Sequence, residues 1–296
     1  MQSEPFCNPN LNLVSGKAQD RAEHLANLAV RALIAEIELT PKPGLVDARG
    51  SGAHTDLSPA LMRRSARSLR NTFERIGLVS FHQVPSLTLR EKLGVIGRSA
   101  ERSMLLTTGG INTHRGAIWA LGLLISAAAM GSNSPKVVAN RAARLARISE
   151  RNARLQESNG LKVVRRFNVP GARGEALAGF PHVIHSALPT LYRSRSQGAS
   201  EAHARLNALL AIMINLEDTC LLHRGGATSL RAAQSGAMAV LAAGGTQTLR
   251  GWGLLHRLDL DLAALNASPG GSADLLAASL FLDSLVHLPK GNYGKA

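Results

Sequence analysis

The chain has 296 residues, of which 45% are hydrophobic and only 3% aromatic, and most of the apolar residues are Ala and Leu. This composition is ample for one sizeable helical core and argues against a sheet, because strands draw on β-branched and aromatic residues. The 34 Lys and Arg residues against 20 Asp and Glu give a formal charge of +14, which favours anionic partners: nucleic acid, acidic membranes or phosphorylated small molecules.

Helical spacing of the apolar residues predicts a series of helices, and no alternating apolar and polar run is long enough to demand a sheet. Residues 1–16 are predicted to be a disordered tail, residues 160–180 are predicted to be irregular, and short strands near 78–84 or 161–167 are weak alternatives. In chain order, the helices are expected over residues 17–39, 58–76, 87–106, 114–130, 135–159, 181–192, 201–222, 227–243 and 273–288. No repeat or linker divides the chain. We therefore expect an all-α fold, with residues 17–296 forming a single compact multi-helix catalytic domain whose Gly-rich loops form the active-site pocket.

The sequence shows neither a signal peptide nor the cysteine spacing of a zinc site. Cys7 and Cys220 lie far apart, and no Cys/His spacing typical of zinc occurs. The N-terminus does not read as a signal peptide, and the longest apolar stretch, residues 116–130, is too short to span a bilayer. We expect a cytoplasmic protein with no membrane association.

The first predicted helix ends in an unusual way. Glu36 continues the apolar stripe one turn after Ala32, so its carboxylate is expected to face the core. The prolines of the segment TPKPG, residues 40–44, stop the helix, and a polar loop that contains Asp47, His54 and Asp56 follows. Carboxylates and imidazole in a fixed loop suit proton transfer or a hard metal ion, although such spacings also arise by chance.

Glycines cluster with charged residues in five loops, at residues 41–56, 107–115, 171–175, 217–226 and 268–274. In the second loop, Gly109 and Gly110 allow close approach of the backbone to a ligand, and Asn112 or Thr113 caps the apolar helix that follows. The start of that helix is a ready anion site, where cationic His114 and Arg115 do not help the helix itself. A plain solvated loop is the equal alternative.

The adjacent acids Glu217 and Asp218 interrupt a nearly continuous apolar helix. A buried carboxylate must be paired, protonated or bound to a metal. Asp218 or Glu217 therefore forms a structural ion pair, binds Mg²⁺ or acts as a general base, and one of the two acids is expected to be only structural. In the third loop, Arg173 and Glu175 form either a phosphate clamp or an exposed pair.

The arginine-rich helix and the motif search give no sign of a nucleic-acid or P-loop site. The arginines at 144, 147, 151 and 154 align on one predicted helix as a solvated face, and aromatic residues for base stacking are nearly absent, which argues against nucleic-acid binding. No P-loop or strand–GxGxxG–helix pattern is present.

Five motifs occur in a fixed order: LTPKPGLVD (39–47) with GAHTD (52–56), TGGINTHRGA (108–117), GARGEA (171–176), DT (218–219) with HRGG (223–226), and SPGGSADLL (268–276). Together, over residues 25–285, they resemble the signatures of the triphosphoribosyl-dephospho-CoA synthase family. Members of that family are all-helical enzymes that join ATP to 3′-dephospho-CoA and release adenine. Their product is the precursor of a prosthetic group, which a holo-carrier-protein synthase receives for the acyl carrier subunit of malonate decarboxylase or citrate lyase.

The resemblance implies a transfer at C1′ of the ATP ribose, with oxocarbenium character in the transition state. The amino-acid sequence of residues 107–124 resembles the malonate decarboxylase branch more than the citrate lyase branch. On this basis the expected general base is Asp218, His54 or His114, in that order, with Glu175 and Glu36 orienting cations or sugar hydroxyls. The triphosphate is assigned to Lys42, Arg115, Arg173, His223 and Arg224, with Gly109, Gly110, Asn112 and Thr113. Mg²⁺ is assigned to Asp47, Asp56 and Asp218.

Alternatives from other classes stay open at this point. They are the citrate lyase counterpart, a metal-dependent nucleotide hydrolase, a non-catalytic nucleotide sensor and, least favoured, a nucleic-acid-binding protein. ATP and 3′-dephospho-CoA are the expected partners, with no nucleic acid, and a homo-oligomer is compatible with the sequence.

Overall fold

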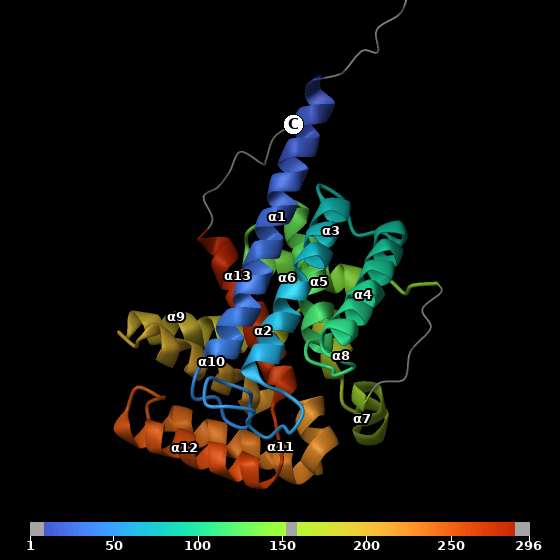
Figure 1. Ribbon diagram of the computed structural model, residues 1–296. Helices are drawn as coiled ribbons and strands as arrows, with labels where there is room; N and C mark the ends of the chain where they lie inside the picture. Colours follow the sequence, from blue (N-terminus) through green and yellow to red (C-terminus); the bar gives the residue numbers. More distant parts are fainter. Residues whose placement is uncertain (1–8, 152–158, 288–296) are drawn as a thin grey trace, which may run out of the picture.

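The computed structural model describes residues 9–151 and 159–287, and over these ranges the protein is a single all-α domain without strands (Figure 1). This confirms the predicted fold class. The helices follow one another as α1 (Pro9–Glu38), α2 (Pro59–Ser68), α3 (Arg70–Ser80), α4 (Leu87–Thr107), α5 (Arg115–Ala129), α6 (Pro135–Arg147), α7 (Asn159–Phe167), α8 (Gly171–Leu177), the π-helix η1 (His182–Ala187), α9 (Leu188–Ser196), α10 (Glu201–Asn215), α11 (Thr219–Ala242), α12 (Leu249–Ala264) and α13 (Gly270–Val286).

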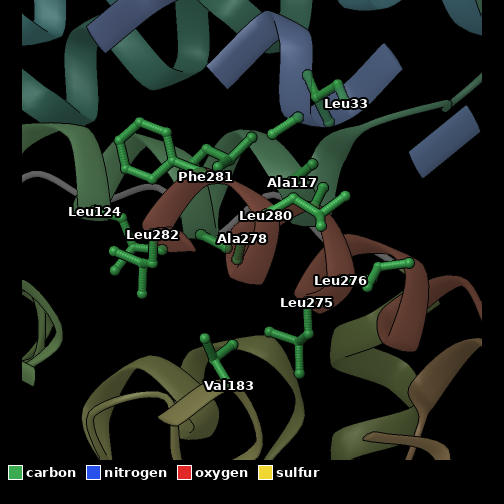
Figure 2. Packing of buried hydrophobic residues seen from close by; sticks show 14 of the residues in the cluster. Leu33, Ala117, Leu124, Val183, Leu275, Leu276, Ala278, Leu280, Phe281 and Leu282 are labelled. Atoms are coloured by element: carbon green, nitrogen blue, oxygen red, sulfur yellow. The ribbon is translucent and has the colours of Figure 1, made fainter. Parts of the chain in front are cut away.

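The core is built around α5 and α13, the two most apolar helices. A helix that is apolar on every side must be surrounded by other helices. Figure 2 shows this for α13, where Leu276, Leu280 and Phe281 pack among side chains of α1, α5 and η1. All three of these side chains are buried. The last helix of the chain is therefore the central one.

Helix starts follow the expected capping chemistry. Ser58, Ser86, Ser200 and Thr248 each precede a helix and accept a hydrogen bond from a backbone N–H of its first turn. The predicted stop after α1 is confirmed, since the helix ends at Glu38, just before Pro41 and Pro43.

Several helix boundaries differ from the sequence-based prediction. The first helix begins at Pro9 rather than at residue 17, and residues 1–8 of the predicted tail lie outside the described residues. The fifth predicted helix ends at Arg147 rather than at 159, because Ile148 takes an extended conformation. The segment predicted to be irregular contains α7 and α8, so the alternative strand at 161–167 is wrong. Residues 78–80 belong to α3, so the strand near 78–84 is also wrong.

The prediction of one helix over residues 201–222 is wrong, and a helix after 248 was missed. Leu216 takes an extended conformation that ends α10, and Asp218 caps a new helix, α11. The predicted break at 223–226 appears as non-helical backbone at Gly226 inside α11. The missed helix, α12, buries only a narrow apolar stripe that includes Leu255, Leu258 and Leu262.

No single helix in the described ranges is long and apolar enough to cross a membrane. The bent pair α10 and α11, which meet at 66°, passes such a test by length and composition alone.

The glycine-punctuated loops meet at one end of the bundle. In Figure 1 the loop after α1 lies beside α11 and α12, and the backbone N–H of Gly44 donates to Asp259 of α12 at 2.9 Å. Gly44 has a φ of +66°, and a Cβ there would lie 2.4 Å from the Ala267 carbonyl oxygen. Only glycine fits that contact, which brings the first and fifth motifs together.

Candidate active site

Glu36 and Lys42 form a buried ion pair where α1 ends. The Lys42 side chain is 1% exposed, and its Nζ donates to the Glu36 carbonyl oxygen at 2.6 Å and to Glu36 Oε1. Burial raises the pKa of Glu36, and the charge and hydrogen bond of Lys42 offset this only in part. The carboxylate of Glu36 thus faces the interior, as predicted. Lys42 was predicted to hold a triphosphate, but its ammonium group is paired with the Glu36 carboxylate in the interior.

Asp47 fixes the loop that follows. Its Oδ2 accepts from the Lys42 backbone N–H at 2.8 Å, and both of its oxygens accept from Arg49. Burial acts to raise the pKa of Asp47, but the hydrogen bonds from Arg49 and from the backbone outweigh it, and the pKa is lowered. Arg49 also pairs with Asp259 of α12. The acceptor capacity of Asp47 is therefore used within the protein.

His54 connects this loop to α11 and to the fifth motif. Arg224 donates to His54 Nδ1 at 2.7 Å, and His54 Nε2 lies 2.9 Å from Ser268 Oγ. Burial lowers the pKa of His54 to about 4, with help from the Arg224 charge. Asp56 lies 3.6 Å from His54 Nδ1, but its side chain is 55% exposed. Both ring nitrogens of His54 are already engaged.

His114 stands immediately before α5 and carries a free nitrogen. The residue is 3% exposed, and its Nδ1 lies 2.9 Å from Ser65 Oγ, which in turn lies 2.6 Å from Thr113 Oγ1. Nε2 is buried without a hydrogen-bond partner in the described ranges. Burial, helped by the nearby Lys42 charge, lowers the pKa of His114 to about 4, so the imidazole is neutral near pH 7.

Asp218 joins the starts of two helices. It caps α11 by accepting from Cys220 N at 2.9 Å, and it accepts from Gly271 N, Ser272 N and Ser272 Oγ at 2.8–3.2 Å at the start of α13. Burial raises the pKa of Asp218, against these hydrogen bonds. Of the two adjacent acids, Asp218 is therefore the buried one, and Glu217 is exposed.

Asp274 makes the corresponding link between α13 and α5. Its carboxylate accepts from Ala117 N, and a Cβ on Gly116 would lie 2.0 Å from Asp274 Oδ2. Loss of surrounding water raises the pKa of Asp274 well above its usual range, and the charges of Glu36 and Asp218 raise it further. The starts of α5, α11 and α13 therefore meet around two carboxylates, where their dipoles favour negative charge.

The loop before α5 is open to solvent. Gly109 and Gly110 have φ of +66° and +90°, and a Cβ on either would meet nothing within 4 Å. The residue at the N-cap position of α5 is His114, without a side-chain cap hydrogen bond, so the predicted cap at Asn112 or Thr113 is wrong. The Asn112 side chain does accept from Arg115 N at 3.2 Å, and Arg115 pairs with Glu101 at 3.1 Å. The exposed backbone leaves room for an anion.

The third motif forms α8 beside this centre. Glu175 is buried and binds His182, accepting from its backbone N–H at 3.0 Å and lying 2.7 Å from Nδ1. This hydrogen bond raises the pKa of His182 and so favours its protonated form. A Cβ on Gly171 would touch Thr219 at 3.4 Å, next to Asp218. Glu175 thus holds η1, whereas Arg173 is exposed.

The predicted candidates fall into three groups. Lys42, His114 and Asp218 gather with Glu36 and Asp274 in the interior. Arg115, Arg173, His223 and Arg224 lie at the surface of the same end, with Gly109, Gly110, Asn112 and Thr113 on the loop before α5. The predicted metal ligands Asp47, Asp56 and Asp218 do not combine. In the described part of the chain, no group of three or more His, Cys, Asp or Glu side chains is arranged to hold a metal ion.

Asp47 and Asp218 use their oxygens for hydrogen bonds, so these residues do not fit a Mg²⁺ site of their own. Sequence reasoning also missed Asp274 and Ser65. The sequence could have indicated Asp274, because it is a lone acid in the first turn of a helix after a Gly-Gly pair. Nothing in the sequence around Ser65 on α2 marks it as a site residue.

A family model described as ATP:dephospho-CoA triphosphoribosyl transferase matches residues 22–292. A Klebsiella pneumoniae protein named 2-(5''-triphosphoribosyl)-3'-dephosphocoenzyme-A synthase is 54% identical over 277 residues, 93% of this chain and 99% of its own. A protein of a Pseudomonas fluorescens strain, named a probable synthase of the same kind, is 58% identical over 268 residues, 89% of this chain and 92% of its own. One from Pseudomonas savastanoi, with the same name, is 55% identical over 273 residues, 91% and 94% of the two chains. No solved structure matches the chain.

Proposed function

The chain belongs to the ATP:dephospho-CoA triphosphoribosyl transferase family and is an enzyme of it, and on this premise we propose that it transfers the triphosphoribosyl group of ATP to 3′-dephospho-CoA. The 2′-hydroxyl oxygen of dephospho-CoA forms a bond to C1′ of the ATP ribose. The bond between C1′ and adenine breaks, the electron pair leaves with adenine, and the proton of the hydroxyl passes to a base. Mg²⁺ arrives on the phosphates of ATP as part of that substrate.

The observation that supports this function best is the group of buried Glu36, Lys42, His114 and Asp218 with half-buried Asp274, close to three helix starts. Cationic character that develops on a ribose is stabilised by nearby carboxylates, and the helix starts favour the anionic substrates. The loop from Gly109 to Arg115, with Arg224, is proposed to hold the triphosphate.

We propose His114 as the base, ahead of Asp218 and His54. Asp218 already accepts four hydrogen bonds, and both nitrogens of His54 are engaged. His114 is neutral and its Nε2 has no partner within the described residues. With Nδ1–H donating to Ser65 Oγ, Nε2 presents its lone pair to a substrate hydroxyl.

The test is adenine release, followed by HPLC with ATP and Mg²⁺, with and without 3′-dephospho-CoA. Adenine that appears only with both substrates, beside a heavier CoA product, is the expected result. Inorganic phosphate or free ribose triphosphate without dephospho-CoA would instead establish a hydrolase. Replacing the base should lower kcat about 10²- to 10⁴-fold. His114→Gln is the variant, and His185→Gln, on an exposed histidine of η1, is the matched control.

For the finer role, we propose the malonate decarboxylase branch, with the product passed to a holo-carrier-protein synthase in the cytoplasm. The amino-acid sequence of residues 107–124 supports this branch. Deleting the gene in its host should leave the acyl carrier subunit of malonate decarboxylase without its prosthetic group, seen by mass spectrometry. An unmodified citrate lyase carrier instead would assign the chain to the other branch.

A further inference from the structure

Two arginines of α4 converge on one carboxylate, and a third, Arg173, acts electrostatically on one of them. Arg90 and Arg98 project from α4, and their NH1 groups lie 3.4 Å and 2.6 Å from the two oxygens of Glu150. The Glu150 carboxylate rests against Gly94, where a Cβ would lie 2.3 Å from its Oε2. Glu150 can offset only one of the positive charges gathered here.

The third guanidinium, that of Arg173 on α8, brings a further positive charge. Arg173 makes no hydrogen bond or ion pair among the described residues, and it lies close enough to act on Arg90. Burial lowers the pKa of Arg90, Glu150 raises it, and the charges of Arg173 and Arg98 lower it. Glu91, the next acid along α4, is taken by Arg151 at 3.1 Å. Three guanidinium groups and one carboxylate therefore leave a net excess of two positive charges, and the Arg173 side chain has no ion-pair partner among the described residues.

The cluster is held in place by packing. The Arg90 side chain is 12% exposed, its guanidinium lies 5.4 Å from the centre of the Trp119 ring, and its Nε is buried with no hydrogen-bond partner in the described chain. Trp119 in turn donates its indole N–H to the Ala172 carbonyl oxygen at 3.2 Å, next to Arg173. Arg98 is 40% exposed, so a ligand can reach the cluster from solvent.

The cluster also adjoins the proposed reaction centre. Trp119 is one turn along α5 from Arg115, and α8 begins at Gly171, where an added Cβ would lie 3.4 Å from the Thr219 side chain, next to Asp218. A substrate whose sugar lies at the starts of α5 and α11 can place its phosphates over Arg90 and Arg173.

We propose that Arg90, Arg98 and Arg173 bind the polyphosphate chain of a nucleotide substrate. Guanidinium groups bind phosphate oxygens through paired, charge-assisted hydrogen bonds, and three of them match a di- or triphosphate. The polyphosphate bound at this site is that of either ATP or dephospho-CoA. That choice rests on the proposed function, whereas the polyphosphate site itself does not.

The first test measures binding of inorganic pyrophosphate by isothermal titration calorimetry. Arg98→Gln and Arg173→Gln should each weaken binding about tenfold or more, since each removes charge-assisted hydrogen bonds. Arg144→Gln, on an exposed arginine of α6, is the matched control and should bind as the unchanged protein does. Equal affinity in all four proteins would overturn the proposal. This titration needs no turnover, so it remains informative if the proposed reaction fails.

The second test assigns the site to one substrate through the KM values. If the site holds dephospho-CoA, Arg98→Gln and Arg173→Gln raise its KM about tenfold and leave the KM for ATP unchanged. If the site holds the triphosphate, the pattern is reversed, and either pattern supports the site. A loss of kcat with both KM values unchanged would contradict it. Retained far-UV circular dichroism and an unchanged urea midpoint show that the variants are folded.

Discussion

Replacing Gly116 by alanine tests the contact that joins α5 to α13. The added methyl group would lie 2.0 Å from Asp274 Oδ2, closer than any carbon and oxygen can approach without a covalent bond. Either the Asp274 carboxylate or the start of α5 must shift. The hydrogen bond from Ala117 N to that carboxylate is then lost or stretched.

The size of the effect follows from three contributions. In an ordinary helix, glycine to alanine stabilises by about 1 kcal/mol. Overpacking a tight contact costs about 1–3 kcal/mol, and losing an ordinary hydrogen bond costs about 0.5–1.5 kcal/mol. The net expectation for Gly116→Ala is a loss of about 0.5–3.5 kcal/mol in the free energy of unfolding, together with lower turnover.

Urea unfolding followed by tryptophan fluorescence measures the change, and adenine release measures turnover. Gly97→Ala is the matched control, because a Cβ at this helical glycine of α4 meets nothing within 4 Å. It should gain up to about 1 kcal/mol. The double variant Gly116→Ala with Asp274→Ala should recover part of the loss, with a coupling of about 1–3 kcal/mol. A Gly116→Ala protein as stable as Gly97→Ala would refute the close packing of Asp274 on α5.

Three further predictions concern other buried charges. Asp218→Asn should remain folded by circular dichroism, lose about 1–3 kcal/mol because its amide opposes the Ser272 N–H, and lose most adenine release; normal turnover would remove Asp218 from the site. The pKa of His182 is raised by Glu175, so the stability that His182 adds is full below about pH 6.5 and is lost as pH rises through its folded pKa. The stability difference between the unchanged protein and His182→Gln should therefore be larger at about pH 6 than at about pH 9, and a constant difference would contradict the ionic pair. Lys42→Met should cost about 3–5 kcal/mol in urea unfolding by leaving the Glu36 carboxylate unpaired, and adding Glu36→Gln should restore part of it; no recovery would show that packing, not charge, sets the loss.

Local rules predicted most of the fold and the places where the polar loops occur. Apolar spacing found α5 and α13, and Pro41 and Pro43 marked the end of α1. The same rules failed between α10 and α11, because Ile212 to Leu222 is apolar enough to read as one helix. The break there depends on Asp218, whose oxygens are satisfied by α13, more than fifty residues away in the chain. The spacing of apolar residues along one helix carries no information about a partner so distant in sequence.

The candidate site shows the same division. Burial of Glu36 followed from its place on the apolar stripe of α1, which is a local feature. The contact of His114 with Ser65 and the approach of Arg173 to Arg90 join residues of different helices. Both depend on how the helices pack, so the sequence could name several of the residues without saying which of them meet.

The central position of α13 has a consequence for how the protein is made. Synthesis proceeds from the N-terminus, and domains generally fold as units once their sequence is available. Here the helix that packs against α1, α5 and η1 begins at Gly270, near the end of the chain. Until it has left the ribosome, the backbone at the start of α5 lacks Asp274, Asp218 lacks Ser272, and the core lacks Phe281. A product truncated before residue 270 therefore lacks the α13 side chains that pack against α1, α5 and η1, and it lacks Ser272 and Asp274.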